Sequence, residues 1–514
     1  MSKSDDKKEI SRRGFIKSAA VGAGALTLTG LTAKVVTAAP LPKKWDKEAD
    51  VIIIGCGGSG VAAAIEAHDA GSKVLILEKT PIPGGSTTLS GGIVYAAGTT
   101  VQKQAGIEDS PEGMYKYWMA YHRDLLDPQV LKVICDQSIE MVEWLQRNGV
   151  EFPPELLYFS GVEEKFGAVT KPVKRGHCAK GRGKGLMDEL MKSVATRKIE
   201  ILYNTPAERL LLNQNGEVAG VQAKTKKGAL NIKAKKAVIL ASGGFARNKA
   251  MVKSYFPDQM AAVPFTAIGH TGDGILMAEK VGAPIVDTGT TELPPSLPAL
   301  EIVPAEKAVM FSSAYFLYKY PYIWVDEEGK RFCDESAYYQ ITAPFISRQK
   351  RAYIVFDDKV KTQVGAGMGF GFSKDLEKEI AEGILKKAAT LEELGNALSV
   401  NPMALKASVE QFNANSKAGS DPDFKRAKGL GAIEMGPFYG GKLTVAVVES
   451  LGGLKIDVDG RILDPYDVPI PRLYGAGAVT ATLRGYPGSG ASITRGLVMG
   501  RVTGKKAAGE KART

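Results

Sequence analysis

The stretch Val51–Glu78 constrains the fold of this 514-residue chain most, because it reads strand, glycine turn, helix, strand. Val51–Ile54 is a β-branched run, which is typical of a strand buried on both faces. Gly55, Gly57 and Gly60 follow with the spacing G-x-G-x-x-G. In this pattern the first glycine permits a tight turn, the second lets a pyrophosphate approach the backbone, and the third lets the helix pack on the strand. The sequence therefore predicts phosphates at the N-terminus of that helix.

An acidic residue ends the second strand of this unit. Lys73–Leu77 forms the predicted strand and Glu78 closes it, where a carboxylate can bind the hydroxyl pair of a ribose. Strand, helix, second strand and terminal acid together favour dinucleotide binding. The alternative is a tight strand-to-helix turn that holds no ligand.

Length, charge and cysteines exclude several classes of protein. A chain of 514 residues is expected to form about two to four domains. The net charge is +11, but no basic stripe with interleaved aromatic residues is present, so no nucleic-acid partner is expected. The four cysteines form no C-x-x-C pair, and Cys56 fits the glycine turn as a small residue. His177 and Cys178 are adjacent, but no second ligand stands at a suitable spacing, so no metal site is predicted.

The N-terminus carries an export pattern. Residues 11–17, SRRGFIK, form a twin-arginine pattern, followed by an apolar run to about Leu31 and small residues at 37–39. We expect residues 1–39 to be a signal peptide, the twin-arginine translocase to be a partner during export, and the mature protein to be periplasmic or extracytoplasmic. The alternative is a chance arginine pair. The apolar run is too short and glycine-rich for a good transmembrane helix.

Changes in composition indicate an inserted unit. Leu293–Pro304 is rich in proline and cannot form a helix, and residues 359–416 read as helical and polar. At Glu449–Thr503 the glycine turns return, and Leu473–Gly477 reads as a strand that enters a second nucleotide-contacting turn. We therefore predict three segments after the signal peptide: 48–280 and 436–510 as two parts of one nucleotide-binding domain, and 281–435 as a capping domain between them.

Aromatic residues alternate within the predicted insertion. Phe316, Tyr318, Tyr320, Tyr322 and Trp324 occupy every second position, so a strand would carry all five on one face. That face is either a packing surface or one wall of an apolar substrate pocket, and the sequence leaves both interpretations open.

These segments, in this order, resemble the flavoprotein superfamily of fumarate reductases and 3-ketosteroid dehydrogenases. The resemblance covers residues 48–508. It implies FAD as the cofactor and an α/β fold, with a Rossmann-type FAD-binding domain interrupted by an inserted α+β capping domain and the substrate between them. The motifs that carry it are specific only together: the glycine turn with Glu78, Gly84-Gly85-Ser86, Gly272-Asp273-Gly274, Gly329-Lys330-Arg331-Phe332 and Gly475-Ala476-Gly477.

The resemblance also implies which residues contact the cofactor. They are Gly55, Gly57, Gly58, Gly60, Glu78, Lys79, Gly85, Ser86, Gly92, Ala207, Ser242, Gly243, Asp273, Gly477, Ala491, Ser492 and Ile493.

A few positions bear on the substrate class. Fumarate reductases carry dicarboxylate-binding arginines after R-F-x-x-E and in the C-terminal glycine loop, and here those places hold Tyr339 and Tyr486. Glu449 stands where those reductases have a histidine before Gly-Gly. The motif Tyr-Pro-Gly-x-Gly at 486–490 is instead similar to the 3-ketosteroid dehydrogenase branch, whose third tyrosine falls on Tyr158.

In that branch the resemblance implies a role for each group. The Tyr486 hydroxyl and the Gly490 amide would hold a ketone oxygen as it becomes enolate-like. Tyr339 would transfer the proton, with Tyr158 or Tyr338 as a relay. The alternative for each tyrosine is a core aromatic residue whose hydroxyl is bonded internally.

We therefore expect an exported FAD-dependent oxidoreductase of the 3-ketosteroid dehydrogenase type, with hydride transfer between a carbon near a ketone and flavin N5. The alternative is a periplasmic, fumarate-reductase-like ene-reductase for an α,β-unsaturated acid or enone. The chain has no haem motif, so a separate cytochrome or a quinone would carry the electrons. A flavin-bearing electron carrier without a substrate is a third interpretation, and the inserted unit argues against it.

Overall fold

The computed structural model describes residues 41–123, 125–159, 162–260, 262–288, 291–292, 295–296, 320–364, 373 and 375–513. The predicted signal peptide therefore lies outside the described residues. Side chains are not described for some residues within these ranges, among them Tyr339.

The helices and strands have the following bounds. The helices are α2 (Gly58–Asp69), α3 (Gly85–Leu89), α4 (Thr100–Gln104), α5 (Pro111–His122), α6 (Pro128–Asp136), α7 (Ser138–Arg147), α8 (Arg182–Thr196), α9 (Lys249–Tyr255), α10 (Asp273–Glu279), α12 (Tyr339–Arg348), α13 (Asp358–Val364), α14 (Glu377–Ala381), α15 (Leu391–Leu398), α16 (Pro402–Lys417) and α17 (Ala491–Ala508). The strands are β1 (Lys47–Ile54), β2 (Val74–Leu77), β3 (Ile93–Tyr95), β4 (Leu157–Tyr158), β5 (Gly176–Cys178), β6 (Glu200–Leu202), β7 (Ala207–Leu212), β8 (Val218–Thr225), β9 (Gly228–Leu240), β10 (Val263–Pro264), β11 (Ile285–Val286), β12 (Thr291–Glu292), β13 (Pro295–Ser296), β14 (Ile323–Asp326), β15 (Ala352–Asp357), β16 (Lys386–Ala388), β17 (Phe438–Val447), β18 (Glu449–Ser450), β19 (Gly453–Leu454), β20 (Arg461–Leu463) and β21 (Pro469–Gly475).

The first sheet has the order β20-β21-β9-β1-β2-β6. In addition, β8 pairs with β9, and β7 pairs with β8. The strands β21, β9, β1, β2 and β6 run parallel, and β20 pairs antiparallel at the edge. All four residues of β2 and the last four of β1 are buried, as expected for apolar strands covered on both faces. This sheet confirms the predicted mixed α/β architecture.

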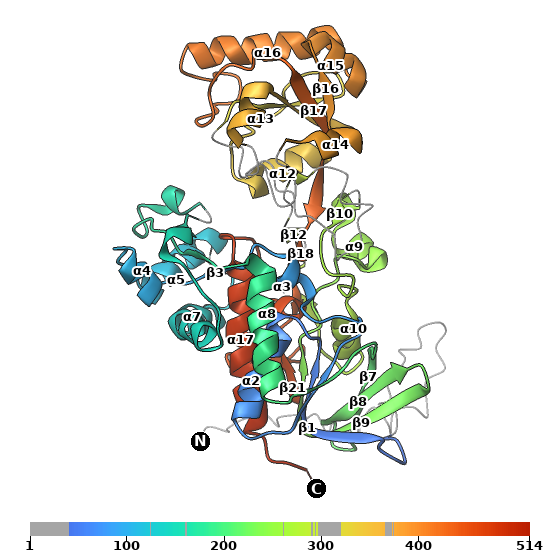
Figure 1. Ribbon diagram of the computed structural model, residues 1–514. Coiled ribbons are helices and arrows are strands. Elements are labelled where there is room, and N and C mark those ends of the chain that lie inside the picture. The colour runs from blue at the N-terminus through green and yellow to red at the C-terminus, as the bar shows by residue number, and fades with distance from the viewer. Residues whose placement is uncertain are drawn as a thin grey trace, which may run out of the picture. The chain divides into compact units, whose positions relative to one another are not determined.

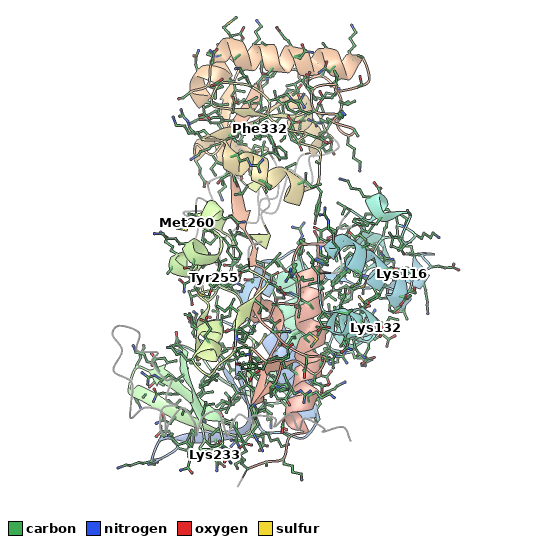
Figure 2. The ribbon with its side chains drawn as sticks, turned by 180° about the vertical axis from the view of Figure 1, so that it is seen from behind. Lys116, Lys132, Lys233, Tyr255, Met260 and Phe332 are labelled. Carbon is green, nitrogen blue, oxygen red and sulfur yellow. The ribbon has the colours of Figure 1, made fainter. Side chains whose placement is uncertain are left out.

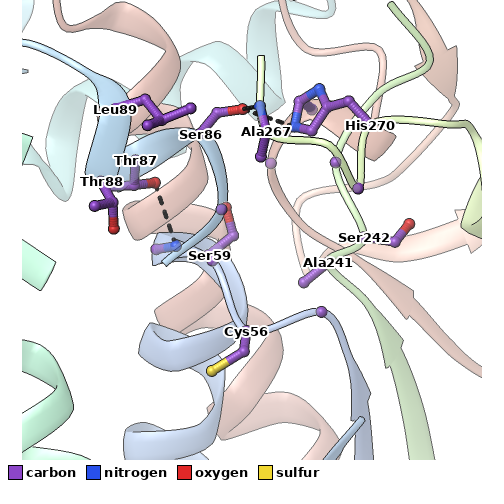
Figure 3. A pocket seen from close by; sticks show the side chains of 18 of the residues that line it. Cys56, Ser59, Ser86, Thr87, Thr88, Leu89, Ala241, Ser242, Ala267 and His270 are labelled. Carbon is purple, nitrogen blue, oxygen red and sulfur yellow. Dashed lines mark hydrogen bonds between the residues drawn. The ribbon is translucent and has the colours of Figure 1, made fainter. Parts of the chain in front are cut away.

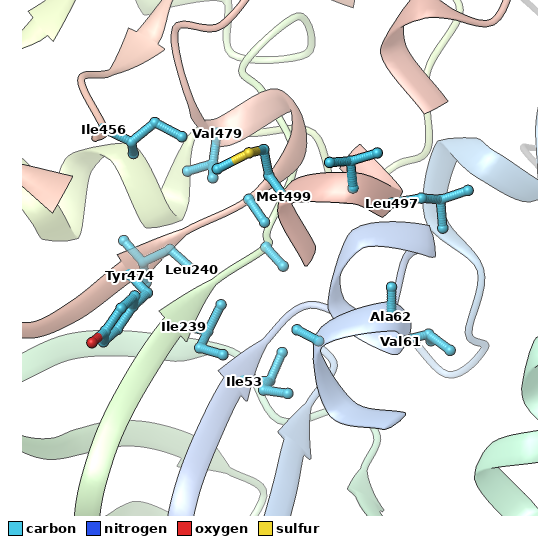
Figure 4. Packing of buried hydrophobic residues seen from close by; sticks show 14 of the residues in the cluster. Ile53, Val61, Ala62, Ile239, Leu240, Ile456, Tyr474, Val479, Leu497 and Met499 are labelled. Atoms are coloured by element: carbon cyan, nitrogen blue, oxygen red, sulfur yellow. The ribbon is translucent and has the colours of Figure 1, made fainter. Parts of the chain in front are cut away.

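Two helices from opposite ends of the chain, α2 and α17, pack against each other beside this sheet (Figure 1). Glycines make the close approach: an added Cβ at Gly500 would lie 2.4 Å from the carbonyl oxygen of Ser59, and one at Gly504 would lie 2.4 Å from that of Ala63. Figure 4 shows the apolar side chains packed around this contact, including Val61 and Leu497. The C-terminal helix thereby covers the helix that follows the first glycine turn.

A second sheet has the order β10-β17-β15-β14, and β13 and β16 pair with β17. We call the described residues 320–447 the inserted lobe. Its strand β14 alternates in the expected way: Ile323 and Val325 join one apolar cluster with α15 and α16, and Trp324 joins another. The strand β17 pairs with β15 throughout 438–443, so residues just after the predicted boundary at 435–436 belong to the second sheet rather than the first.

The aromatic row therefore serves packing as far as it is described. Tyr322 and Trp324 are fully buried in the core of the inserted lobe, and Tyr320 packs against the same cluster. Phe332, labelled in the inserted lobe in Figure 2, packs against this cluster, and its ring contacts that of Trp324. Positions 316 and 318 lie outside the described residues.

The described part of residues 359–416 contains the helices α14 and α15, most of α13 and α16, and the strand β16. No helix within the described ranges has both the length and the apolar character needed to cross a bilayer.

Candidate functional site

A cavity of about 500 Å³ lies where parallel strands of the first sheet end. Its wall includes Ile54 at the end of β1, Leu77 at the end of β2 and Ala241 just after β9. Ligands of open α/β sheets bind outside the carboxyl ends of the strands, so the position of this cavity is that of a binding site.

The glycine turn after β1 forms one side of the cavity. An added Cβ at Gly55 would lie 2.4 Å from the carbonyl oxygen of Ala241, and one at Gly60 would lie 2.0 Å from that of Gly55, so both positions exclude a side chain. Gly57 differs, because the nearest protein atom to a Cβ there, apart from its chain neighbours, would be Gly84 O at 3.8 Å. The space beside Gly57 opens into the cavity and fits a pyrophosphate at the N-terminus of α2.

Glu78 is buried in the cavity wall and held by three donors. The amide of Cys56 donates to one carboxylate oxygen over 2.9 Å, and the amide and hydroxyl of Thr80 donate to the other over 2.8 and 2.7 Å. These bonds fix the carboxylate at the end of β2, the position suited to a ribose. Burial, together with the charge of Glu78, raises the pKa of the Cys56 thiol to about 12, so the thiol stays neutral and unreactive at neutral pH.

Two polar side chains in the wall have atoms without a hydrogen-bond partner among the described residues. These atoms are Ser242 Oγ and His270 Nδ1, and both are buried. The other ring nitrogen of His270 lies 3.2 Å from Ser86 Oγ (Figure 3). Burial and the nearby cations Arg247, Lys79 and Arg495 lower the pKa of His270 to about 4, so its ring is neutral. Unpaired buried polar atoms are costly, and a polar cofactor such as FAD fits this wall by supplying their partners.

Lys79 and Asp273 form an ion pair across the same wall. Lys79 Nζ lies 2.6 Å from Asp273 Oδ2 and donates to Thr271 Oγ1 over 2.5 Å. The opposite charges of Lys79 and Asp273 therefore neutralise each other beside the start of α10.

The cavity brings together most of the cofactor-binding residues predicted from the sequence. Gly60, Gly92 and Ala491 do not line it. Gly92 instead faces the backbone of Arg182, which would lie 2.1 Å from an added Cβ. The predicted residues that do line it are Gly55, Gly57, Gly58, Glu78, Lys79, Gly85, Ser86, Ala207, Ser242, Gly243, Asp273, Gly477, Ser492 and Ile493.

Sequence reasoning missed several lining residues, among them His270 and Thr87. His270 precedes the Gly272-Asp273-Gly274 motif and comes next to Ser86 only in three dimensions. Thr87 accepts a hydrogen bond from the amide of Gly58 over 3.3 Å, at the start of α2. His270 lies in the loop before Gly272-Asp273-Gly274, and Thr87 lies on α3 directly after Gly84-Gly85-Ser86. This proximity to recognised motifs is the signal that would have found them.

Tyr486 and Gly490 line the same cavity, at the entrance to α17. The amide of Gly490 donates to the phenolic oxygen of Tyr486 over 3.0 Å. The sequence-based expectation was that both groups donate to one ketone oxygen, and the structure differs, because the amide is bonded to the phenol. The bond uses one acceptor position of the phenolic oxygen.

Of the other two predicted tyrosines, the structure describes the side chain of Tyr158 alone. Tyr158 lies on β4 in a separate sheet with β3 and β5, and it is not among the lining residues. The side chain of Tyr339 lies outside the described part of the chain, although its backbone begins α12. Tyr338, a suggested relay, donates instead to the backbone carbonyl oxygen of Tyr486 over 3.0 Å.

The cations of the cavity wall, within the described residues, are Lys79 and Lys184, and no arginine is among them. Arg331 of the R-F motif is buried in the inserted lobe, 2.9 Å from Glu335 and 2.8 Å from Asp421. Both ring nitrogens of His177 also have hydrogen-bond partners inside the protein. They lie within 2.8 Å of Arg175 O and Thr99 Oγ1.

Comparisons with known proteins agree with a flavin site. The model of the FAD binding domain family matches residues 50–493. A fumarate reductase (cytochrome) of Shewanella frigidimarina is 31% identical over 463 residues, which cover 89% of this chain and 77% of that protein. A urocanate reductase of Eggerthella lenta is 31% identical over 476 residues, which cover 91% and 76%. The crystal structure of a 3-ketosteroid-Δ4-(5α)-dehydrogenase from Rhodococcus jostii RHA1 is similar with a TM-score of 0.73 and 28% identity, covering 92% of this chain and 100% of that one.

Proposed function

This chain belongs to the FAD binding domain family, and on that premise we propose that it transfers hydride between its flavin and a carbon–carbon bond next to a neutral carbonyl group. The protein is an FAD-dependent oxidoreductase that acts on CH–CH bonds. Bound FAD supplies the acceptor or donor of the hydride. The residues of the chain bind and orient the reactants and transfer the proton.

The observation that carries this proposal is the pair formed by Tyr486 and Gly490 at the cavity wall. The Gly490 amide donates to the phenolic oxygen, which polarises the phenol and strengthens its O–H as a donor. A positioned donor of this kind stabilises a carbonyl oxygen as negative charge develops on it. No arginine lines the cavity among the described residues, so a neutral carbonyl fits this wall better than a dicarboxylate.

The adjacent carbon must lose or gain a proton during the reaction, and we assign this transfer to Tyr339 because of the family resemblance. A free tyrosine has a pKa of about 10, so Tyr339 needs a neighbouring group to act as a base. Tyr338 does not serve as that group in the structure, because its hydroxyl is bonded to the backbone of Tyr486.

A second candidate function is reduction of an α,β-unsaturated acid, since reduction of an enone already falls within the first proposal. Both reductase relatives, at 31% identity, favour it. Under either function we propose that a separate cytochrome or a quinone exchanges electrons with the flavin. We also propose export by the twin-arginine route, which replacement of Arg12 and Arg13 by lysine would block in a cell-fractionation assay.

Anaerobic flavin spectroscopy distinguishes the two functions. Oxidised, FAD-loaded protein is mixed with a saturated 3-ketosteroid, and the reduced protein is mixed with 4-androstene-3,17-dione, fumarate or urocanate. Bleaching by the steroid, or reoxidation by the steroid enone alone, supports the proposal. Reoxidation by fumarate or urocanate without any response to steroid supports the second candidate and contradicts the first.

A further inference from the structure

Glu449 is a buried carboxylate in the wall of the flavin cavity. It lies on β18 and is 5% exposed. One carboxylate oxygen accepts a hydrogen bond from the guanidinium of Arg495, and the other accepts one from the hydroxyl of Ser492. Both partners are in the first turns of α17, so the carboxylate bridges this helix to the strand that returns from the inserted lobe.

Arg495 is held directly behind this wall. It is 1% exposed, and one of its terminal nitrogens donates to Thr480 O over 2.9 Å and to Thr482 Oγ1 over 2.8 Å. The other terminal nitrogen is bonded to Glu449. The charge of Arg495 reaches the cavity, since it contributes, after burial and the larger effects of Arg247 and Lys79, to the lowered pKa of His270. The side chain of Glu449 thus lies between the cavity and the guanidinium of Arg495, and it neutralises the positive charge of that group.

We propose that Glu449 is a specificity-determining residue that cancels the charge of Arg495, so that the flavin cavity accepts neutral carbonyl compounds and discriminates against carboxylates. This inference rests on the proposed function and names the substrate charge for the same site. Its physical basis is the high cost of a buried charge that lacks a partner. Without the carboxylate of Glu449, the guanidinium of Arg495 would be satisfied best by an anionic ligand in the cavity.

The test compares the holoenzyme with its Glu449→Gln variant, which keeps the size of the side chain and removes the charge. The probes are cinnamate and its neutral analogue cinnamamide, whose binding is followed by the flavin difference spectrum. The preference for cinnamamide over cinnamate is expected to fall at least about tenfold in the variant. The midpoint potential of the flavin, measured by dye equilibration, is expected to shift to a more positive value, because a negative charge has left its surroundings.

A second buried ion pair, between α17 and α2, supplies the matched control. Arg501 lies 2.7 Å from Glu66 of α2, both side chains are largely buried, and neither residue lines the cavity. Glu66→Gln makes the same chemical change at the partner of Arg501, which lies about two turns after Arg495 on α17. It is expected to leave both the binding preference and the midpoint potential unchanged, although it lowers stability.

The double variant Glu449→Gln, Arg495→Gln covers the case in which the single variant does not fold, because it leaves no unpaired buried cation. Its preference between the two probes is expected to stay close to that of the wild-type protein. Gain of cinnamate binding in the double variant overturns the proposal. An unchanged preference and an unchanged potential in a folded Glu449→Gln variant overturn it as well. The potential requires no turnover, so it tests Glu449 even if every ketone proves inert and the proposed function fails.

Discussion

The hydroxyl of Tyr338 donates a hydrogen bond to the backbone carbonyl oxygen of Tyr486 over 3.0 Å. Tyr338 directly precedes α12 in the inserted lobe, and Tyr486 lies in the loop that leads into α17. Both side chains are buried in the same apolar cluster as the first sheet. This single bond therefore ties the inserted lobe to the loop that carries the proposed carbonyl-binding phenol.

We expect Tyr338→Phe to lower kcat by about ten- to hundredfold, because small displacements of a catalytic group are costly. The variant keeps the buried ring and removes only the hydroxyl. Steady-state kinetics with the accepted substrate provide the measurement, and FAD binding is expected to remain normal.

Tyr322→Phe is the control for this prediction. The Tyr322 hydroxyl donates to the carbonyl oxygen of Glu335 over 2.7 Å, entirely within the inserted lobe. Each variant should lose about 1 kcal/mol of stability, as is usual for one buried hydrogen bond. Equal kcat values in the two variants would show that Tyr338 stabilises the fold without positioning Tyr486.

Tyr486→Phe is expected to reduce turnover by at least about a hundredfold, since removal of one donor to a developing oxyanion commonly costs about 2.7–4 kcal/mol. The ring and its packing remain, so the flavin spectrum should change little, while loss of the acceptor for the Gly490 amide is expected to lower stability by about 1–3 kcal/mol. Single-turnover flavin kinetics isolate the hydride step. An unaffected rate of flavin reduction would remove Tyr486 from the mechanism.

Alanine substitution at two glycines of the first turn is expected to affect different properties of the protein. Gly57→Ala is expected to leave the apoprotein stable, because the nearest protein atom to its Cβ, apart from chain neighbours, lies 3.8 Å away. The same substitution is expected to weaken FAD binding at least about tenfold by filling the phosphate space. Gly60→Ala is expected to destabilise the fold by about 1–3 kcal/mol, because its Cβ would lie 2.0 Å from the carbonyl oxygen of Gly55. Denaturation of apoprotein and FAD titration measure the two effects, and equal behaviour of the variants would contradict the assignment.

Stability is expected to fall as the pH falls from about 6.5 to about 4. Burial lowers the pKa of His122 to about 3 and that of His177 and His270 to about 4. The unfolded chain therefore binds more protons than the folded protein in this range. Each histidine contributes a slope of up to about 1.4 kcal/mol per pH unit.

The variant His177→Gln isolates one of these contributions. Urea unfolding of the apoprotein at several pH values gives the slope for both proteins, and the carboxylates that titrate in the same range cancel in the difference. The variant is expected to lose about a third of the histidine-dependent slope. Identical slopes would mean that His177 becomes protonated without unfolding.

Much of the fold was predictable because its signals are local. The glycine turn, the acid at the end of β2 and the return of glycine turns near the C-terminus indicated a split nucleotide-binding fold, and most of the residues proposed from these motifs line one cavity. The strand β17 is apolar and contains glycine, like a strand of the first sheet, and its hydrogen bonds to neighbouring strands such as β15 assign it to the second sheet. His270 was missed because nothing near it in the sequence indicates Ser86 as its neighbour.

The sequence by itself determined the turn after β1, since the steric requirements of Gly55 and Gly60 act within a few residues of chain. Only the tertiary structure decided that Glu449 meets Arg495, 46 positions away, and that the Gly490 amide bonds to Tyr486 rather than pointing at a substrate. The physical reason is that a charge or a hydrogen-bond donor has no fixed partner until packing brings two segments together. The chemical character of the cavity wall depends on those partners.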